Sequence, residues 1–137
     1  MPEPKGVEVK VVPALAAIEA AAWDDVANPD LAHYNPFVSH AFLSALEKAK
    51  CVGPGTGWTP RHLIVESEDG RIEAAAPCYA KTHSQGEYVF DHAWADAYLQ
   101  AGGRYYPKLQ IAVPFTPVPG PRLLVRPGAE AAANEQV

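Results

Sequence analysis

The sequence predicts an α/β (α+β) fold in which a mainly antiparallel sheet is flanked by helices. Three observations lead to this class: short stretches that alternate apolar and polar residues, longer stretches with helical spacing between them, and two strand-like stretches joined by a tight Asp-Gly turn. The chain has 137 residues, of which 48% are hydrophobic and 20% are charged, a normal mixture for a globular protein. We therefore expect a single domain over residues 1–137 with its own hydrophobic core.

The first third of the chain is predicted to hold one strand and two helices. Residues 7–12 alternate and are rich in valine, which favours a strand. Pro13 suits the first turn of a helix. Apolar residues then follow at helical spacing until Asn28-Pro29, where the helix should end because proline disfavours a helical conformation in the residue before it. A second helix is expected over residues 39–50, since its first residue is a serine, a good N-cap.

The middle of the chain is predicted to form an antiparallel hairpin over residues 61–80. Residues 61–66 are a compact strand candidate, and apolar residues alternate along the returning strand from residue 72 to residue 78. The dipeptide Asp69-Gly70 lies between the two arms and tolerates the positive φ angles that hairpin turns require. The turn dipeptide and the alternation along the returning strand therefore predict the same hairpin.

A third helix is predicted from Asp91, which occupies the N-cap position, to Gly102, which suits the position just after a helix end. His92 and Asp96 project from one side of this helix and are expected to be exposed. The other side is expected to be apolar and largely buried. Its residues are Trp94, Ala97, Tyr98 and Ala101.

Strands are predicted on both sides of that helix. Residues 87–91 form the candidate before it, and residues 108–115 alternate after it. Pro114 cannot donate a ladder hydrogen bond, so the second of these strands should lie at a sheet edge or carry a bulge. A last short strand is expected at residues 122–125. Residues 126–137 are expected to be disordered or to begin a helix that the chain does not complete.

Charge and composition exclude several classes of function. A net charge of -5 does not favour nucleic acid as a general partner. No apolar run approaches the ~18 residues of a membrane span, and the N-terminus lacks the basic-then-apolar leader of a secretory signal. Cys51 and Cys78 have no metal-ligand spacing and are expected to be reduced thiols that are not bonded to each other. We therefore expect a cytoplasmic protein.

Ionisable and aromatic residues gather between residues 90 and 106. His92 and Asp96 lie four residues apart and project from one helical face. A metal site would need a third ligand, and capping already accounts for Asp91, so no metal is expected. The face could be a solvated surface, or it could line a site.

Other residues of chemical interest have structural explanations. The glycine-rich residues 53–57 follow a helix and precede a strand, the reverse of the context of a phosphate-binding loop, so we interpret them as a connector. Tyr105 and Tyr106 lead into a strand, where paired tyrosines usually pack. The other histidines and the two cysteines show no nucleophile pattern.

Four stretches between about Asn35 and Gly128 resemble successive blocks of one bacterial family. They read "NPFVSHAFLSALE", "VGPGTGWTPRHL", "GEYVFDHAWADAY" and "YYPKLQIAVPFTPVPGPRLLV". The family is the peptidoglycan biosynthesis/recognition (FemAB-like) family of N-acyltransferase-like proteins, related to the Fem aminoacyltransferases. The resemblance implies the N-terminal portion of a GNAT fold. It also implies an acyl-CoA or aminoacyl donor and a small-molecule or peptide amine as the acceptor.

The family pattern is matched only in part. Family members resemble one another over a chain more than twice as long, with two acyltransferase-like halves. The usual acyl-CoA pyrophosphate loop, Arg/Gln-x-x-Gly-x-Gly/Ala, is not matched by "RPGAE" at residues 126–130. Such a loop holds the pyrophosphate on backbone N–H groups at a helix N-terminus. We therefore expect this chain alone to show little or no acyl transfer when release of free CoA thiol is followed.

In the chemistry that the resemblance implies, an amine attacks a thioester or ester carbonyl with the help of a general base. From residue type and clustering, we expect His92 to be the base and Asp96 to orient the substrate or contact its amine. The candidate catalytic residues are His92, Asp96 and Asp91, and the candidate substrate-binding residues are Trp94, Tyr105 and Tyr106. Trp94 and Tyr106 would form the wall of the site.

The alternative is a non-catalytic recognition module that binds a peptide or a cell-wall fragment. Such a module could also associate with a second copy through unpaired edge strands of its sheet. The two hypotheses differ in one measurable property. A protein that binds the acyl donor must be stabilised by acyl-CoA, whereas a recognition module need not be.

Overall fold

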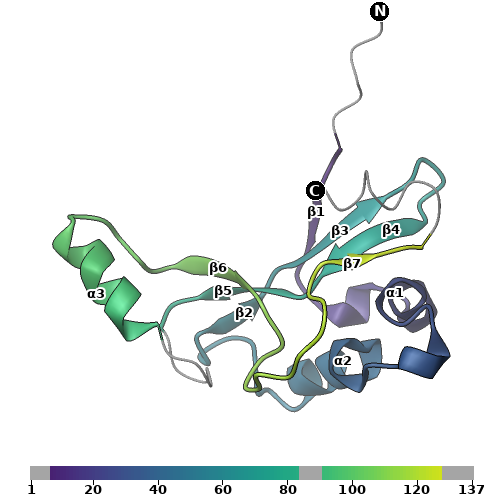
Figure 1. Cartoon of the computed structure of the whole chain (residues 1–137), viewed down its shortest axis with the longest axis horizontal. Coiled ribbons are helices and arrows are strands. Elements are labelled where there is room, and N and C mark those ends of the chain that lie inside the picture. The colour runs from purple at the N-terminus through teal and green to yellow at the C-terminus, as the bar shows by residue number, and fades with distance from the viewer. Residues whose placement is uncertain (1–6, 84–90, 128–137) are drawn as a thin grey trace, which may run out of the picture.

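The computed structural model describes residues 7–83 and 91–127. Its strands form two antiparallel sheets (Figure 1). The first sheet has the order β1-β3-β4-β7, with β1 at Lys10–Val12, β3 at His62–Glu66, β4 at Ile72–Ala76 and β7 at Leu124–Val125. The second has the order β2-β5-β6, with β2 at Trp58–Pro60, β5 at Cys78–Lys81 and β6 at Lys108–Ile111.

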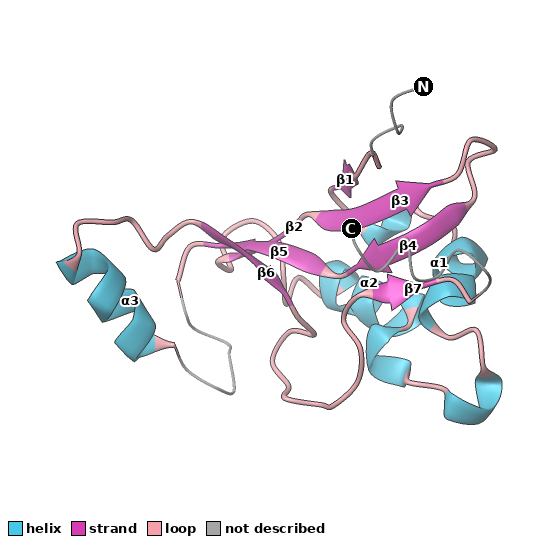
Figure 2. Cartoon of the chain, turned by 45° about the horizontal axis from the view of Figure 1, so that its top comes forward, coloured by secondary structure: helices cyan, strands magenta, loops and turns pink. Residues whose placement is uncertain are grey.

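Three α-helices accompany the sheets: α1 at Ala20–Ala27, α2 at His40–Lys48 and α3 at His92–Gln100. Short 3₁₀ turns occur at Leu15–Ala17, Leu31–His33 and Pro36–Val38. Helices α1 and α2 cover one side of the four-stranded sheet, whereas α3 lies at the far end of β5 and β6 (Figures 1 and 2). The predicted α/β class with antiparallel strands and flanking helices is confirmed, with two sheets in place of one. We call the unit of β5, α3 and β6 the arm.

The first helix is interrupted where the sequence predicts a continuous one. The 3₁₀ turn at Leu15–Ala17 is followed by Ile18, whose backbone is extended (φ −117°, ψ 132°). The imidazole Nε2 of His40, on α2, lies 2.7 Å from the carbonyl oxygen of Leu15 and 2.8 Å from that of Ile18. A distant side chain thus uses carbonyls that a continuous helix would need for its own hydrogen bonds. The prediction failed because this contact is tertiary, and α1 begins only at Ala20.

Helix α2 forms as predicted because its N-terminus is capped. The Oγ of Ser39 accepts a hydrogen bond from the backbone N–H of Phe42 at 3.2 Å and donates one to the carbonyl of Pro36 at 2.6 Å. Such a cap satisfies one of the free N–H groups of the first turn. The cap and the apolar face of α2 place Leu43 in the core with no exposed surface.

The predicted hairpin forms between β3 and β4 but ends earlier than expected. Gly70 has a φ of +84° in the turn, as the Asp-Gly dipeptide predicts. The returning strand leaves the first sheet at Pro77, and β5 pairs with β2 and β6 instead. Proline has no N–H to donate, so the ladder breaks there. Apolar residues alternate without a break from residue 72 to residue 78, so the sequence pattern gives no sign that the strand changes sheet at Pro77.

The remaining predicted elements agree in part with the structure. Strand β6 is an edge strand of its sheet, as Pro114 suggests, but it ends at Ile111. The glycine-rich residues 53–57 connect α2 to β2, and the backbone N–H of Gly53 donates to the carbonyl of Trp58 at 2.7 Å. The predicted strand at residues 87–91 lies almost wholly outside the described residues, as does nearly all of the predicted C-terminal segment 126–137. Within the described part of the chain, no helix is long and apolar enough to cross a membrane.

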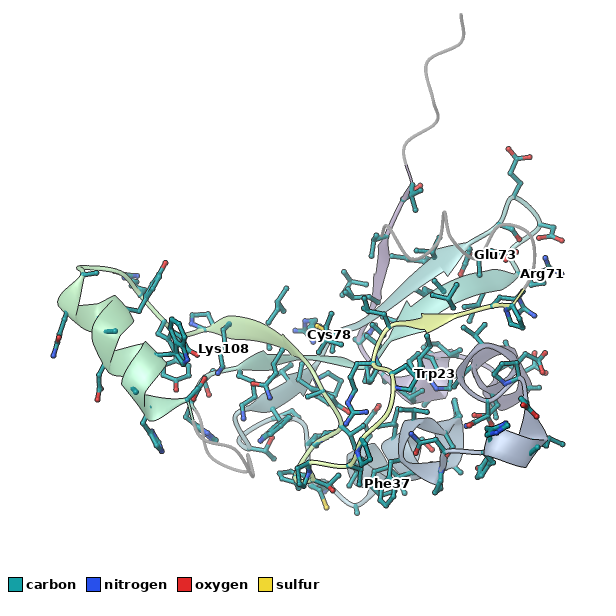
Figure 3. The ribbon with its side chains drawn as sticks, in the orientation of Figure 1. Trp23, Phe37, Arg71, Glu73, Cys78 and Lys108 are labelled. Atoms are coloured by element: carbon teal, nitrogen blue, oxygen red, sulfur yellow. The ribbon has the colours of Figure 1, made fainter. Side chains whose placement is uncertain are left out.

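The main core lies between the four-stranded sheet and helices α1 and α2. Trp23 is its largest fully buried side chain, and its indole N–H donates to the carbonyl of Val38 at 2.9 Å. Figure 3 shows Trp23 far from Lys108, which lies in the arm. A smaller cluster of Val52, Trp58 and Tyr79 fills the base of the second sheet. The core therefore holds the body of the molecule but does not extend to α3.

Cys51 is exposed and Cys78 is buried, and neither forms a disulfide, as predicted. Burial raises the pKa of the Cys78 thiol, and the thiolate is the reactive form. We therefore expect a thiol reagent to modify Cys51 quickly in the folded protein and Cys78 only after unfolding. Timed labelling followed by mass spectrometry tests this order, with a Cys51→Ser variant as the control. Rapid labelling of Cys78 in that folded variant would contradict it.

Candidate functional site

A carboxylate, an ammonium group and two tyrosines meet where α3 and β6 join in the arm. The Asp91 carboxylate accepts hydrogen bonds from the Tyr105 hydroxyl and the Lys108 ammonium. Lys108 Nζ also lies 3.4 Å from the Tyr105 hydroxyl oxygen. The Asp91 and Lys108 side chains are each 19% exposed, so this ion pair is partly withdrawn from water and less screened than a surface pair.

Aromatic rings surround the ammonium group of Lys108. Its Nζ lies 4.7 Å from the ring centroid of Tyr105 and 5.7 Å from that of Tyr106. The two rings meet edge to face, with centroids 5.0 Å apart and planes at 87°. Both distances are within the range of cation–π attraction. The Asp91 carboxylate and these two rings therefore place one negative charge and two aromatic rings around a cation, which here is the Lys108 ammonium.

Local sequence explains why these residues meet. Gly102 and Gly103 end α3 by donating to the carbonyls of Leu99 and Tyr98, each at 3.0 Å, which is the usual pattern of a helix that stops at glycine. A Cβ on Gly103 would come within 2.3 Å of the Tyr98 ring. The chain can therefore fold back closely beneath Tyr98, and Tyr105 packs against that ring at 6.1 Å.

Asp91 has a different role from the one its position suggests. It occupies the N-cap position of α3 but makes no capping hydrogen bond to the helix. Its carboxylate instead accepts hydrogen bonds from Tyr105 and Lys108, which follow α3 in the chain. The prediction of a capping aspartate is therefore wrong, because charged and phenolic donors bind a carboxylate more strongly than a backbone N–H does.

The predicted burial of one face of α3 is wrong. Trp94 is 76% exposed and Tyr98 is 52% exposed, while Ala95 is buried. The spacing argument assumes that a helix packs on the main core, but α3 packs only within the arm (Figure 1). His92 and Asp96 are exposed, as predicted. The structure thus gathers three of the candidate residues, Asp91, Tyr105 and Tyr106, and leaves Trp94, His92 and Asp96 on the exposed surface of α3.

Lys108 belongs to the cluster and was missed by sequence reasoning. The sequence places it only on the predicted alternating strand that follows the tyrosines. The available signal was a lysine three residues after Tyr105, close to a second tyrosine. Among the described residues, no group of three His, Cys, Asp or Glu side chains is arranged to hold a metal ion.

The hydrogen bond to Asp91 raises the pKa of Tyr105, because it stabilises the neutral phenol, whereas Lys108 acts in the opposite direction. We expect Asp91→Asn to lower the Tyr105 pKa. The stabilisation from this bond is present at neutral pH and is lost as pH rises through the raised pKa. An NMR titration of isotope-labelled tyrosine measures the shift, and Tyr105→Phe assigns the signal. Asp96→Asn, an exposed carboxylate change on the same helix, should leave the pKa unchanged; an equal shift in both variants would refute the assignment.

A second polar cluster is buried at the junction of the two sheets. His62 has no exposed side-chain surface. Its Nδ1 accepts from the backbone N–H of Cys78 at 3.3 Å, so its Nε2 carries the hydrogen that is donated to the Glu47 carboxylate at 3.1 Å. Glu47 also accepts from the N–H of Leu15 at 2.9 Å. Because substrate cannot reach His62, we interpret this cluster as structural.

Tyr79 lies beside that cluster and is fully buried. Its ring centroid is 5.3 Å from that of His62. Burial, followed by the negative charge of Glu47, raises the pKa of Tyr79 far above its usual range. Its hydroxyl has no hydrogen-bond partner among the described residues. The phenol is therefore neutral at every physiological pH and takes no part in acid–base chemistry.

Comparison with protein families gives one match. A model of the FemAB-like family, described as peptidoglycan biosynthesis/recognition, matches residues 14–137. The matched range includes every described helix and every strand except β1. Comparisons with curated proteins and with solved structures give no match.

Proposed function

The chain belongs to the FemAB-like family of peptidoglycan biosynthesis/recognition, and on this premise we propose that it serves a reaction in which an acyl or aminoacyl group is transferred to an amine, with little or no turnover by this chain alone. The family match over residues 14–137 is the observation that carries this proposal. In the reaction, the amine nitrogen loses a proton to a base and bonds to the carbonyl carbon of the donor. The thiol or hydroxyl of the donor leaves with a proton.

The groups around the Lys108 ammonium support an amine as the acceptor. Lys108 presents a primary ammonium to a carboxylate and two tyrosine rings, and a substrate ammonium has the same charge and the same hydrogen-bonding needs. In this proposal Asp91 and Tyr106 bind the acceptor amine when Lys108 moves aside. His92 remains our candidate base and Asp96 a candidate contact to the amine.

The remaining parts of the proposal do not depend on the contacts around Lys108. The donor is an acyl-CoA or an aminoacyl ester. Trp94 is a candidate wall for the substrate because its side chain is exposed on α3. We also propose a cytoplasmic location, which the two unpaired thiols favour.

The experiment that tests the acceptor site is a binding titration with a matched pair of peptides. One peptide is a peptidoglycan stem peptide with a free side-chain amine, and the other is the same peptide with that amine acetylated. We expect the free amine to bind and the acetylated one to bind at least about tenfold more weakly, because the charge that Asp91 and the rings attract is lost.

Two variants make this titration specific. Lys108→Gln should strengthen binding of the free amine, since the competing ammonium is removed, and Asp91→Asn should weaken it. Equal binding of the two peptides, or no effect of either variant, would exclude the arm as the acceptor site. A separate assay with acetyl-CoA and the free-amine peptide, following release of CoA thiol, should show little or no transfer by this chain alone, and robust turnover that His92→Ala abolishes would overturn this expectation.

A second candidate function is recognition without catalysis. The observation that favours it is the exposure of Trp94, Tyr98 and Leu99 on α3, at the end of the arm. Neighbouring exposed apolar side chains commonly mark a binding surface. On this hypothesis a peptidoglycan fragment stacks on Trp94 whether or not its amine is acetylated. Binding that Trp94→Ala abolishes and Asp91→Asn leaves unchanged would favour recognition over transfer.

A further inference from the structure

A pocket opens where the end of α2 meets the loop that leads to β2. Its apolar walls come from three separate parts of the chain: Pro13, Val52, Pro54 and Pro60. Two charged side chains, Glu47 and Lys50, also line it. Its empty volume, with the open mouth included, is about 860 Å³, which is within the range of small-molecule sites. The pocket shares no lining residue with the cluster around Asp91.

The Glu47 carboxylate is fixed at this pocket but has no paired cation. The N–H of Leu15 donates to it at 2.9 Å and the imidazole of His62 at 3.1 Å, and only 14% of its side chain is exposed. His62 donates as a neutral imidazole, because its Nδ1 accepts from a backbone N–H. Among the described residues, no lysine or arginine forms an ion pair with Glu47. Binding of a cation would therefore stabilise this partly buried carboxylate.

The end of α2 favours a cation in the same place. Helix α2 ends at Lys48, one residue after Glu47. The carbonyl groups at the end of a helix carry the negative end of its dipole, which attracts positive charge within the last turn. The helix end and the carboxylate of Glu47 therefore act in the same direction.

Lys50 occupies a position after α2 that usually holds glycine. Its φ is +61°, and its N–H donates to the carbonyl of Glu47 at 3.1 Å while the N–H of Cys51 donates to that of Leu46 at 2.9 Å. Glycine adopts this helix end most easily, because a Cβ strains a residue with positive φ. A residue that is kept in a strained conformation suggests a function for its side chain. Lys50 is exposed and, within the described part of the chain, forms no ion pair.

We propose that this pocket binds a free α-amino acid with an apolar side chain. The ammonium of the amino acid pairs with Glu47, its carboxylate pairs with Lys50, and its side chain packs on the proline and valine walls. A simple cation fits less well because Lys50 repels it, and a simple anion fits less well because Glu47 repels it. The site lies outside the arm, so this function does not depend on the transfer reaction proposed above.

Three ligands that differ in their charged groups test the proposal. They are L-leucine, N-acetyl-L-leucine, which lacks the ammonium, and L-leucine methyl ester, which lacks the carboxylate. Each is titrated into the full chain at about pH 6, below the pKa of an α-amino group, while backbone amide signals are followed by NMR. We expect L-leucine to bind at least about tenfold more tightly than either derivative, because each derivative loses one charge-assisted hydrogen bond. The amide signals of Val52 and Gly53 should shift.

One variant tests the carboxylate contact without endangering the fold. Lys50→Gly removes the ammonium and relieves the strain at positive φ, so its denaturant midpoint should be no lower than that of the wild type. It should bind L-leucine and the methyl ester equally well. Lys48→Gln removes an exposed charge from the same helix and should keep the full preference for L-leucine. Because Glu47 also supports the fold, N-acetyl-L-leucine tests its contact without a substitution there.

Asp91→Asn separates this site from the arm, and it should leave L-leucine binding unchanged. Loss of binding in that variant would place the ligand in the arm and overturn the proposal. The proposal is also wrong if L-leucine causes no shift at Val52 and Gly53, or if N-acetyl-L-leucine binds as tightly as L-leucine. Tighter binding of L-leucine by Lys50→Gly would likewise overturn it, because Lys50 would then compete for Glu47 instead of holding the ligand. Shifts at Val52 and Gly53 that persist in Asp91→Asn, with the preference over the ester lost only in Lys50→Gly, support it.

Discussion

Replacing Trp23 with alanine should lower the free energy of unfolding by about 3–5 kcal/mol. The indole is fully buried between α1, the 3₁₀ turn at Pro36–Val38 and the sheet, and its ring packs edge to face on His62 at 5.9 Å. Its removal leaves a cavity and also leaves the carbonyl of Val38 without the indole donor. Because a domain of this size has only about 5–15 kcal/mol of stability, the substitution should remove a substantial fraction of it.

Urea denaturation followed by circular dichroism measures this effect. Trp94→Ala provides a matched control, because it removes the same side chain from a position that is 76% exposed. The control should change stability by less than about 0.5 kcal/mol. If Trp94→Ala were as harmful as Trp23→Ala, the assignment of the core to the four-stranded sheet and helices α1 and α2 would be wrong.

Replacing Glu47 with alanine should cost about 2–5 kcal/mol. The carboxylate accepts from the N–H of Leu15 and from the imidazole of His62. Its removal leaves both donors unsatisfied in a buried place, at about 1–3 kcal/mol each. The effect is large because one side chain connects the 3₁₀ turn, α2 and β3, three segments that are far apart in the sequence.

Equilibrium unfolding of the variant and a double-mutant cycle with His62→Ala measure this contribution. Glu66→Ala is the control, since Glu66 pairs with Lys10 at 3.4 Å on the surface and such pairs contribute about 0–1 kcal/mol. The cycle should show a coupling between Glu47 and His62 of at least about 1 kcal/mol. Additive effects of the two substitutions would show that the pair does not act as a unit.

The elements predicted correctly are those specified by local chemistry. The serine before α2 supplies its own cap, and Asp69-Gly70 supplies its own turn. The errors arise where a distant residue decides the outcome. His40 interrupts the first helix through the carbonyls of Leu15 and Ile18. The change of sheet at Pro77 shows the same limit, because alternation alone does not say which neighbour a strand will pair with.

The sequence predicts some of the residues that cluster around Asp91, but it does not predict how they are arranged. Clustering in the sequence was enough to single out Asp91 and the two tyrosines, because a short loop returns the chain to the start of α3. It could not show which face of α3 would be covered, since hydrophobic spacing gives the direction of an apolar face but not whether anything packs on it. Lys108 was missed because its contacts with Asp91 and Tyr105 form only when the chain after α3 folds back and brings these residues together.

The way the arm joins the body has a consequence for local unfolding. Its two strands enter the body side by side, and the N–H of Ala112 donates to the carbonyl of Pro77 at 3.2 Å at that entrance. Beyond it, Ala95 is the only buried residue of α3, and Leu109 on β6 is 69% exposed. The α3 and β6 part of the arm can therefore open while β3 and β4 stay paired, and its amides should exchange with deuterium before theirs do. A ligand that holds Asp91, Tyr105 and Tyr106 together would slow exchange in the arm alone, so exchange rates report occupancy of the site separately from the stability of the fold.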